Sequence, residues 1–447
     1  MLFLLCLGFF LSHPAYGETP QGTEAAAKED KKDAMYRSLE DFGNAIDMVM
    51  HGYVEDVDVK ALVGAAINGM LQSLDPHSAY LDEQFYEDMQ IRTKGKFGGL
   101  GINVTMDEGV VKIVSPIDDT PAARAGLQSN DLIIEIDGAP VFGMTLQEAV
   151  NLMRGDPGTT IVIKVLRGKE EPRDVTIVRD IIKIKSVRGR LEGDVGYIRI
   201  TDFNQNTRDT LITAIDELKE QKAKKDTHDP RIKGYILDLR NNPGGLLDQA
   251  IAVSDAFLST GEIVSTRGRN KARIARWDAA NDDLIDGLPL VVLINQGSAS
   301  ASEIVAGALQ DHKRAIVLGT RSFGKGSVQT IRNLTPASAV RMTTALYYTP
   351  SGRSIHKKGI EPDIVVEQIP LPEETEEEDA ERRAPTNKTE DADASDDTET
   401  NATSTHYSAE SQKDFQLLRA IDLLRGVHYF QDAKMNATAH DPSVSRR

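Results

Sequence analysis

The stretch from residue 290 to residue 309 constrains this chain more than any other. Five apolar residues, Leu290–Ile294, are typical of a buried strand. The small and polar residues 295–303 follow, and an apolar helical pattern begins directly after them. Such a strand, turn and helix place one side chain at the positive end of a helix, beside free backbone N–H groups. Ser300 occupies that position.

Two interpretations of Ser300 remain open on this segment alone. Serine is favoured as a helix N-cap, and Glu303 follows at the spacing of a capping box. The same geometry also suits a nucleophilic hydroxyl, because small neighbours let another backbone approach it. A serine nucleophile needs a general base, so the choice depends on the rest of the chain.

Two nearby side chains could supply that base. His312 lies twelve residues along the expected helix, which is about 18 Å from Ser300 and too far. We expect His312 at the carboxyl end of the helix instead. Lys325 has glycine on both sides and follows strand 315–318, which should run parallel to strand 290–294. An apolar pocket would lower the pKa of Lys325 and leave a neutral amine.

Lys325 also has a rival role in phosphate binding. Residues 319–326 nearly match a P-loop, but the position after the lysine must carry a Ser or Thr hydroxyl, and it is Gly326.

An acyl transfer from a substrate to Ser300 would also need hydrogen-bond donors for the oxyanion, and a different turn could supply them. Strand 234–239 ends in residues 240–245, Arg-Asn-Asn-Pro-Gly-Gly, which could expose N–H groups to an oxyanion or could be a plain tight turn.

The pattern of apolar residues predicts several folded units. Residues 30–90 have helical spacing, and residues 95–170 read as short strands with one helix near 146–154. In residues 180–367, strands alternate with helices, which predicts an α/β core with crossover connections. The expected strands are 195–200, 234–239, 290–294 and 315–318, and the expected helices lie near 207–222, 246–258 and 300–312.

Charge is concentrated in one segment. The net charge is −17, but residues 371–400 alone hold thirteen acidic and three basic side chains. Residues 368–411 are therefore expected to form a disordered acidic linker, followed by a helix at 412–430 that docks back or mediates assembly. A sequence pI of about 5.1 argues against a nucleic-acid partner.

The amino terminus predicts export. Residues 2–12 are apolar but too few to span a bilayer, and Ala15 and Gly17 suit signal-peptidase cleavage after residue 17. Cys6 is the only cysteine, so a mature chain would carry no thiol. A retained membrane anchor, a buried strand and lipidation of Cys6 are the alternatives. We expect a periplasmic or membrane-associated bacterial protein.

Three motifs together resemble the carboxy-terminal processing peptidase (tail-specific protease) family of serine peptidases. They are Leu-Arg-Asn-Asn-Pro-Gly-Gly at 239–245, Gly-Ser-Ala-Ser-Ala-Ser-Glu at 297–303 and Gly-Lys-Gly-Ser-Val-Gln at 324–329. The resemblance implies that Ser300 is the nucleophile and Lys325 the general base. It further implies that Gln329 orients the lysine and that the N–H groups of Gly244 and Ala301 form the oxyanion hole.

The same family carries a PDZ domain where residues 95–170 lie. Its carboxylate-binding loop would be Gly99, Leu100, Gly101 and Ile102, whose N–H groups can cradle a terminal carboxylate. Arg167 resembles a sensing arginine that links peptide capture to the active site, although a strand-end arginine is usually only solvated.

The resemblance implies a multidomain α/β and β protein with a crotonase/Clp-protease-like core, an inserted PDZ domain and amino-terminal helices. It implies an endopeptidase that acts on proteins with a free carboxy-terminus, with an adaptor or a second copy as further partners. It requires no metal and no cofactor. Two rival interpretations are a non-catalytic PDZ scaffold and a hydrolase of non-peptide acyl substrates.

Overall fold

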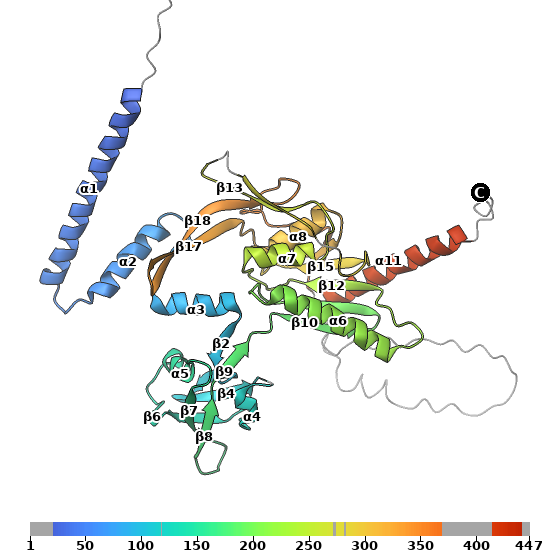
Figure 1. Ribbon diagram of the computed structural model, residues 1–447, viewed down its shortest axis with the longest axis horizontal. Coiled ribbons are helices and arrows are strands. Elements are labelled where there is room, and N and C mark those ends of the chain that lie inside the picture. Colours follow the sequence, from blue (N-terminus) through green and yellow to red (C-terminus); the bar gives the residue numbers. More distant parts are fainter. Residues whose placement is uncertain (1–20, 118, 271–273, 281–282, 369–413, 440–447) are drawn as a thin grey trace, which may run out of the picture. The chain divides into compact units, whose positions relative to one another are not determined.

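The structure, a computed structural model, describes residues 21–117, 119–270, 274–280, 283–368 and 414–439 (Figure 1). The expected signal peptide with Cys6, and the expected acidic linker from residue 369 onward, lie outside these residues. The chain forms two compact units, Met1–Leu74 and Asp75–Arg447. In the described residues, no helix has the length and apolar character needed to cross a membrane.

The first unit contains two helices, as the helical spacing predicted. They are α1 (Gln21–Gly52) and α2 (Val59–Gln72). The Asp58 side chain caps α2 by accepting the Lys60 N–H at 2.8 Å. Apolar side chains at helical spacing on α1, including Met35, Leu39 and Phe42, are exposed.

The second unit begins with a short strand, a helix and a small β domain. Strand β1 (Ala79–Leu81) is followed by α3 (Glu83–Lys94), and β2 (Lys96–Gly99) pairs with β9 (Asp180–Lys183). Between β2 and β9, a sheet has the order β3-β4-β5-β7-β8, so β3 lies at one end of it. Its strands are β3 (Ile102–Asp107), β4 (Val110–Pro116), β5 (Leu132–Ile136), β7 (Thr160–Leu166) and β8 (Arg173–Val178), with β6 (Ala139–Pro140) beside β5.

Two helices belong to this small domain. They are α4 (Pro121–Arg124) and α5 (Leu146–Met153), the latter as predicted. A buried apolar core that includes Val111, Ile133 and Ile163 lies between the sheet and the helices. The domain therefore has its own core.

The central sheet of the second unit has six strands in the order β10-β11-β12-β15-β16-β19. All neighbours from β11 onward are parallel, which confirms the predicted crossover arrangement. The strands are β10 (Val187–Glu192), β11 (Val195–Ile200), β12 (Gly234–Asp238), β15 (Leu290–Ile294), β16 (Ile316–Gly319) and β19 (Ile364–Val365).

Helices cover both faces of this sheet (Figure 1). On one face α6 (Thr207–Lys225), α7 (Leu247–Asp255) and α8 (Ala301–Asp311) pack on Leu237, Val292 and their neighbours. On the other face, Leu417, Ile421 and Leu424 of α11 (Phe415–Ala439) pack on Ile236, Val291 and Leu318. The carboxy-terminal helix thus docks back on the core, and it extends beyond the predicted end at residue 430.

The second unit also contains a separate five-stranded sheet. It has the order β1-β18-β13-β14, with β17 also paired to β18. Its remaining strands are β13 (Glu262–Gly268), β14 (Ile274–Asp278), β17 (Ser327–Thr335) and β18 (Ser338–Tyr348). Because β1 pairs with β18, residues 79–81 are joined to a strand more than 250 positions away along the chain.

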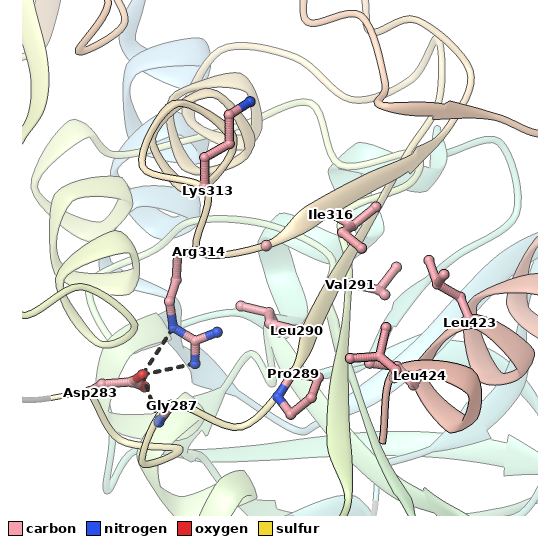
Figure 2. A pocket seen from close by; sticks show the side chains of 12 residues that line it. Asp283, Gly287, Pro289, Leu290, Val291, Lys313, Arg314, Ile316, Leu423 and Leu424 are labelled. Carbon is pink, nitrogen blue, oxygen red and sulfur yellow. Dashed lines mark hydrogen bonds and ion pairs between the residues drawn. The ribbon is translucent and has the colours of Figure 1, made fainter. Parts of the chain in front are cut away.

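A cavity of about 340 Å³ lies between α11 and the starts of β15 and β16 (Figure 2). Leu290, Leu423 and Leu424 contribute apolar walls, and the ion pair of Arg314 with Asp283 stands at its edge at 2.8 Å. Neither Ser300 nor Lys325 lines it. The cavity is therefore separate from the site built by the three motifs.

Candidate active site

Ser300 stands at the amino-terminal end of α8, where β15 passes through a tight turn into the helix. Its φ is +55°, a left-handed conformation that non-glycine residues rarely adopt. Its backbone carbonyl accepts the N–H groups of Glu303 and Ile304, so the helix begins directly after it. The strained turn presents a half-buried side chain at the positive end of the helix.

The turn after β12 lies directly against Ser300. Gly244 has a φ of +102°, and a Cβ there would meet the Ser300 Cβ at 2.8 Å and the Ala301 nitrogen at 2.9 Å. Only glycine therefore fits this approach of the two loops. In this structure the Gly244 N–H donates to the Asn242 side chain at 2.9 Å. The structure brings Gly244, Ala301 and Ser300 together.

Asparagine and serine side chains fix the two loops to each other. Asn295 Nδ2 donates to the Asn241 side chain, and Ser298 Oγ donates to the Leu239 carbonyl, at 2.9 and 2.8 Å. Ser302 Oγ and the Ala299 N–H both donate to the Asn242 carbonyl, each at 3.0 Å. The turn that carries Ser300 is therefore held by several independent hydrogen bonds.

The Glu303 carboxylate connects the Ser300 turn with the Lys325 loop. Its Oε2 accepts the N–H groups of Ser300 and Lys325, at 2.8 and 2.9 Å. Its Oε1 accepts the Ser322 hydroxyl and the Gly324 N–H, at 2.6 and 2.7 Å. Burial raises the pKa of Glu303, although these four donors favour its charged form. The backbone nitrogens of Ser300 and Lys325 are thus no more than about 6 Å apart.

Lys325 lies in an environment that disfavours its charged form. It is half-buried, and burial is the main cause that lowers its pKa, with the charge of Arg341 adding to the effect. A lower pKa makes the neutral amine, which can accept a proton, more abundant. In the described residues, the structure shows no hydrogen bond between the Ser300 and Lys325 side chains.

Gln329 lies on β17, close to the lysine in sequence. Its Nε2 donates to Ser327 Oγ at 3.2 Å and to Thr343 Oγ1 at 2.8 Å. Its Oε1 is buried and has no hydrogen-bond partner among the described residues. The amide therefore has one acceptor that is left for a donor.

The fold excludes His312 as the base for Ser300 and also excludes a P-loop at Lys325. His312 is the C-cap of α8, as expected, and its Nε2 lies 2.7 Å from the Glu262 carbonyl. The Lys325 loop runs into strand β17, whereas a P-loop runs into a helix. Neither a histidine base for Ser300 nor a nucleotide site fits this geometry.

The glycine loop at 99–102 connects β2 with the terminal strand β3 of the small β domain. Gly101 has a φ of +81°, and a Cβ there would meet the Thr120 side chain at 2.4 Å. The Gly101 carbonyl accepts the Ile117 N–H at 2.8 Å, and the Leu100 carbonyl accepts the Ala122 N–H at 2.9 Å. These carbonyls are turned into the domain, which fixes the loop beside the free edge of β3.

Arg167 is paired within the small β domain. Its guanidinium donates to both carboxylate oxygens of the buried Asp131 at 2.7 Å, and to the Gly126 carbonyl at 2.9 Å. Burial alone would raise the pKa of Asp131, but the bonds from Arg167 and the Gln128 N–H lower it. No residue of the central sheet is among these partners.

Sequence reasoning missed two carboxylates beside the site. Glu303 was recognised only as half of a capping box, whereas it also binds the lysine loop. Asp75 was not assigned a role at the site, whereas the segment that follows it reaches β18. The charge of Lys325 contributes to lowering the pKa of His77, in that same segment, after burial as the largest cause. The capping-box spacing of Glu303 from Ser300 and the turn-forming dipeptide Asp75-Pro76 were the available signals.

Two family models match parts of the chain that contain this site and the small β domain. Residues 194–366 match the model of peptidase family S41, and residues 112–167 match a PDZ domain. A carboxy-terminal-processing protease of Bartonella bacilliformis is 57% identical over 339 residues, covering 76% of this chain and 77% of that protein. The chain belongs to peptidase family S41.

Two further sequence matches, to a family model and to a curated protein, agree with this membership. Residues 8–85 match the amino-terminal domain of the activating protease CtpB. The carboxy-terminal processing protease CtpA of Bacillus subtilis is 36% identical, over 77% of this chain and 71% of that protein. A solved photosystem II D1 C-terminal processing protease is 30% identical, over 70% of this chain and 84% of that chain, with a TM-score of 0.42. The predicted family, the fold class and the serine-type peptidase activity are confirmed.

Proposed function

We propose that this S41 peptidase cuts proteins with a dyad of Ser300 and Lys325. The carrying observation is the Glu303 carboxylate, which binds the backbone N–H groups of both residues and so fixes the two loops together. The lowered pKa of Lys325 supports a neutral amine as base.

In the proposed reaction the Lys325 amine accepts the Ser300 hydroxyl proton as the oxygen attacks the scissile carbonyl. The protonated amine then gives this proton to the leaving amine, and an acyl-enzyme remains on Ser300. Water, deprotonated by the same lysine, attacks the ester and releases the new carboxylate with the serine restored. Gln329 orients the lysine through its unpaired Oε1.

The oxyanion that forms during attack needs hydrogen-bond donors. The Ala301 N–H lies at the start of α8 and the Gly244 backbone packs on it, which supports these two groups as the donors. Since the Gly244 N–H donates to Asn242 Oδ1 here, it must turn from that amide toward the substrate.

Substrate selection would use the PDZ domain. The edge strand β3 can pair with an extended peptide, and the N–H groups of the loop from Gly99 to Ile102 would bind its terminal carboxylate. Arg167 would link this capture to the core only if it left Asp131. We further propose that the substrates are exported proteins and that the chain is cleaved after Gly17, leaving a periplasmic enzyme.

The direct test compares single variants on an unstructured protein with a free carboxy-terminus. Ser300→Ala and Lys325→Ala should each lower turnover by about 1,000-fold or more. His312→Gln is the control and should retain turnover within about twofold, because it removes a base that lies at the wrong end of α8. Retained turnover in Ser300→Ala or Lys325→Ala would contradict the dyad.

Capture is tested separately with paired substrates. Amidating the terminal carboxylate should raise KM while the chain remains cleavable, because the loop N–H groups lose their anionic acceptor. Equal KM values for acid and amide would remove the loop from the proposal without affecting Ser300.

A further inference from the structure

The unpaired Oε1 of Gln329 raises a question of amide orientation. A glutamine amide has an oxygen end and an NH₂ end of nearly the same shape, so hydrogen-bond partners must decide which end faces which group. Here the NH₂ end faces Ser327 Oγ and Thr343 Oγ1, and the buried oxygen end is left without a partner in the described part of the chain. Both hydroxyl groups could in principle donate or accept. The NH₂ end is therefore fixed in place only if a further contact makes one of these hydroxyl oxygens an acceptor.

Thr343 is the partner with the shorter bond, at 2.8 Å from Gln329 Nε2. The two residues face each other in the register of β17 with β18. The Thr343 hydroxyl also interacts favourably with the Asp75 carboxylate, because it is one of the groups that lower the pKa of Asp75. A hydroxyl has one proton, and an ionised carboxylate can only accept, so the Thr343 proton points to Asp75. Toward Gln329, the Thr343 oxygen is then an acceptor.

Asp75 is held in place by the turn that it forms. Its Oδ1 accepts the N–H groups of His77 and Ser78, at 2.8 and 3.0 Å, and its Oδ2 accepts the Ser78 hydroxyl at 2.8 Å. The Ser78 oxygen in turn accepts the Thr343 N–H at 3.2 Å, and Arg341 Nε donates to the His77 carbonyl at 3.0 Å. The turn is thus fixed to the strand that carries Thr343.

The charge state of Asp75 is consistent with this role. Burial alone would raise its pKa, but hydrogen bonds from Ser78, the His77 N–H and Thr343 outweigh burial and lower it. Asp75 therefore remains a carboxylate at neutral pH, and the direction of the Thr343 proton is fixed.

We propose that Asp75 and Thr343 are positioning residues that orient the Gln329 amide, so that its oxygen end faces the Lys325 amine. This inference rests on the proposed roles of Gln329 and Lys325. The relay runs from the Asp75 carboxylate through the Thr343 hydroxyl to the Gln329 NH₂ group. Without it the amide can rotate by half a turn and present NH₂ to the lysine, which repels the protonated amine that forms during attack. The relay therefore acts on kcat and leaves peptide capture unchanged.

The test uses the full chain and substitutions at two neighbouring threonines of β18. Thr343→Val removes the hydroxyl and keeps the β-branched shape, and Thr343→Ser restores the hydroxyl. Thr344→Val is the matched control, because the exposed Thr344 hydroxyl bonds only to Thr330 among the described residues, at 2.6 Å. Asp75→Asn is the second variant, since its remaining Oδ1 can still accept the turn N–H groups.

Thr343→Val and Asp75→Asn should lower kcat by about 10- to 100-fold with KM unchanged, the range expected when a charge-assisted contact is lost. Thr343→Ser and Thr344→Val should stay within about threefold of the wild type. Equal losses in Thr343→Val and Thr343→Ser would show that packing matters and the hydroxyl does not, and wild-type kcat in Thr343→Val would also overturn the relay. Ser300→Ala in the same assay separates the two claims: if it is inactive while Thr343→Val is fully active, only the relay fails.

Discussion

Two carboxylates, Glu303 and Asp75, hold the same site in different ways. Glu303 is buried and binds three backbone N–H groups and one hydroxyl of the Ser300 turn and the Lys325 loop. Asp75 is half-buried and belongs to a turn whose side chains reach β18 and, through Thr343, Gln329. Burial raises the pKa of Glu303, whereas hydrogen bonds outweigh burial at Asp75 and lower its pKa.

Glu303 fixes the backbone of two loops, whereas Asp75 orients the side chain of Gln329. Glu303 has four donors, so the loss of one leaves three that still hold the loops. The path from Asp75 to Gln329 is a single chain, in which the loss of one member breaks the connection. We therefore expect Glu303 to dominate stability and Asp75 to affect mainly the chemical step.

The largest effect is expected from Glu303→Ala. Four buried or half-buried donors lose a charged acceptor, and each unpaired buried group costs about 1–3 kcal/mol, so the free energy of unfolding should fall by about 3 kcal/mol or more. Activity should fall by at least about 100-fold, since the Ser300 turn and the Lys325 loop are both released. Thermal unfolding and kcat check this. The control is Glu361→Ala, at an exposed pair with Arg321, which should change stability by under about 0.5 kcal/mol.

A smaller effect is expected from the serine that donates to each carboxylate. Ser322→Ala removes the bond to Glu303 at 2.6 Å and the bond from the Ile360 N–H at 2.7 Å, and should cost about 1–3 kcal/mol of stability with little loss of kcat. Ser78→Ala should do the reverse, with a loss of about 1 kcal/mol and a clear fall in kcat. Measuring Tm and kcat for both variants decides it. If the same variant showed the larger loss in both Tm and kcat, the two carboxylates would not differ in role.

The smallest effect is a pH dependence of stability with opposite sign at the two sites. The raised pKa of Glu303 means that the folded state takes up its proton first, so the stability of the wild type relative to Glu303→Gln should grow as pH falls through the folded-state pKa toward 4.5. The lowered pKa of Asp75 means that its contribution is complete above 3.8 and disappears as pH falls through the folded pKa. Urea unfolding of the wild type and each variant across this range measures both slopes. Slopes of the same sign would contradict the assignment.

Much of the fold could be predicted because it follows local patterns. The parallel strands, the helices between them and the turn at Ser300 are visible as runs and periods in the sequence. The position of Lys325 after β16 followed from the parallel pairing of β15 with β16. His312 was placed correctly at the end of α8 by counting residues along a helix.

The supporting contacts could not be predicted in the same way. Ser322 and Lys325 reach Glu303 from about twenty positions away, and Asp75 belongs to a turn that bonds to Thr343 from more than 260 positions away. These partners meet because separate loops and sheets pack, and no periodic pattern records that packing. The hydrogen bond from the Gly244 N–H to Asn242 is also set by the final loop conformation.

In the proposed dyad, a neutral Lys325 activates Ser300. The most direct measurement is the rate at which a serine-directed acylating reagent labels the protein, followed by intact mass and peptide mapping over a pH series. We expect one label, on Ser300, with a rate that rises with pH through a pKa below the ordinary lysine value of 10.5. In Lys325→Ala this rate should be at least about 100-fold lower. Labelling of another residue, or equally fast labelling of Ser300 in Lys325→Ala, would contradict it.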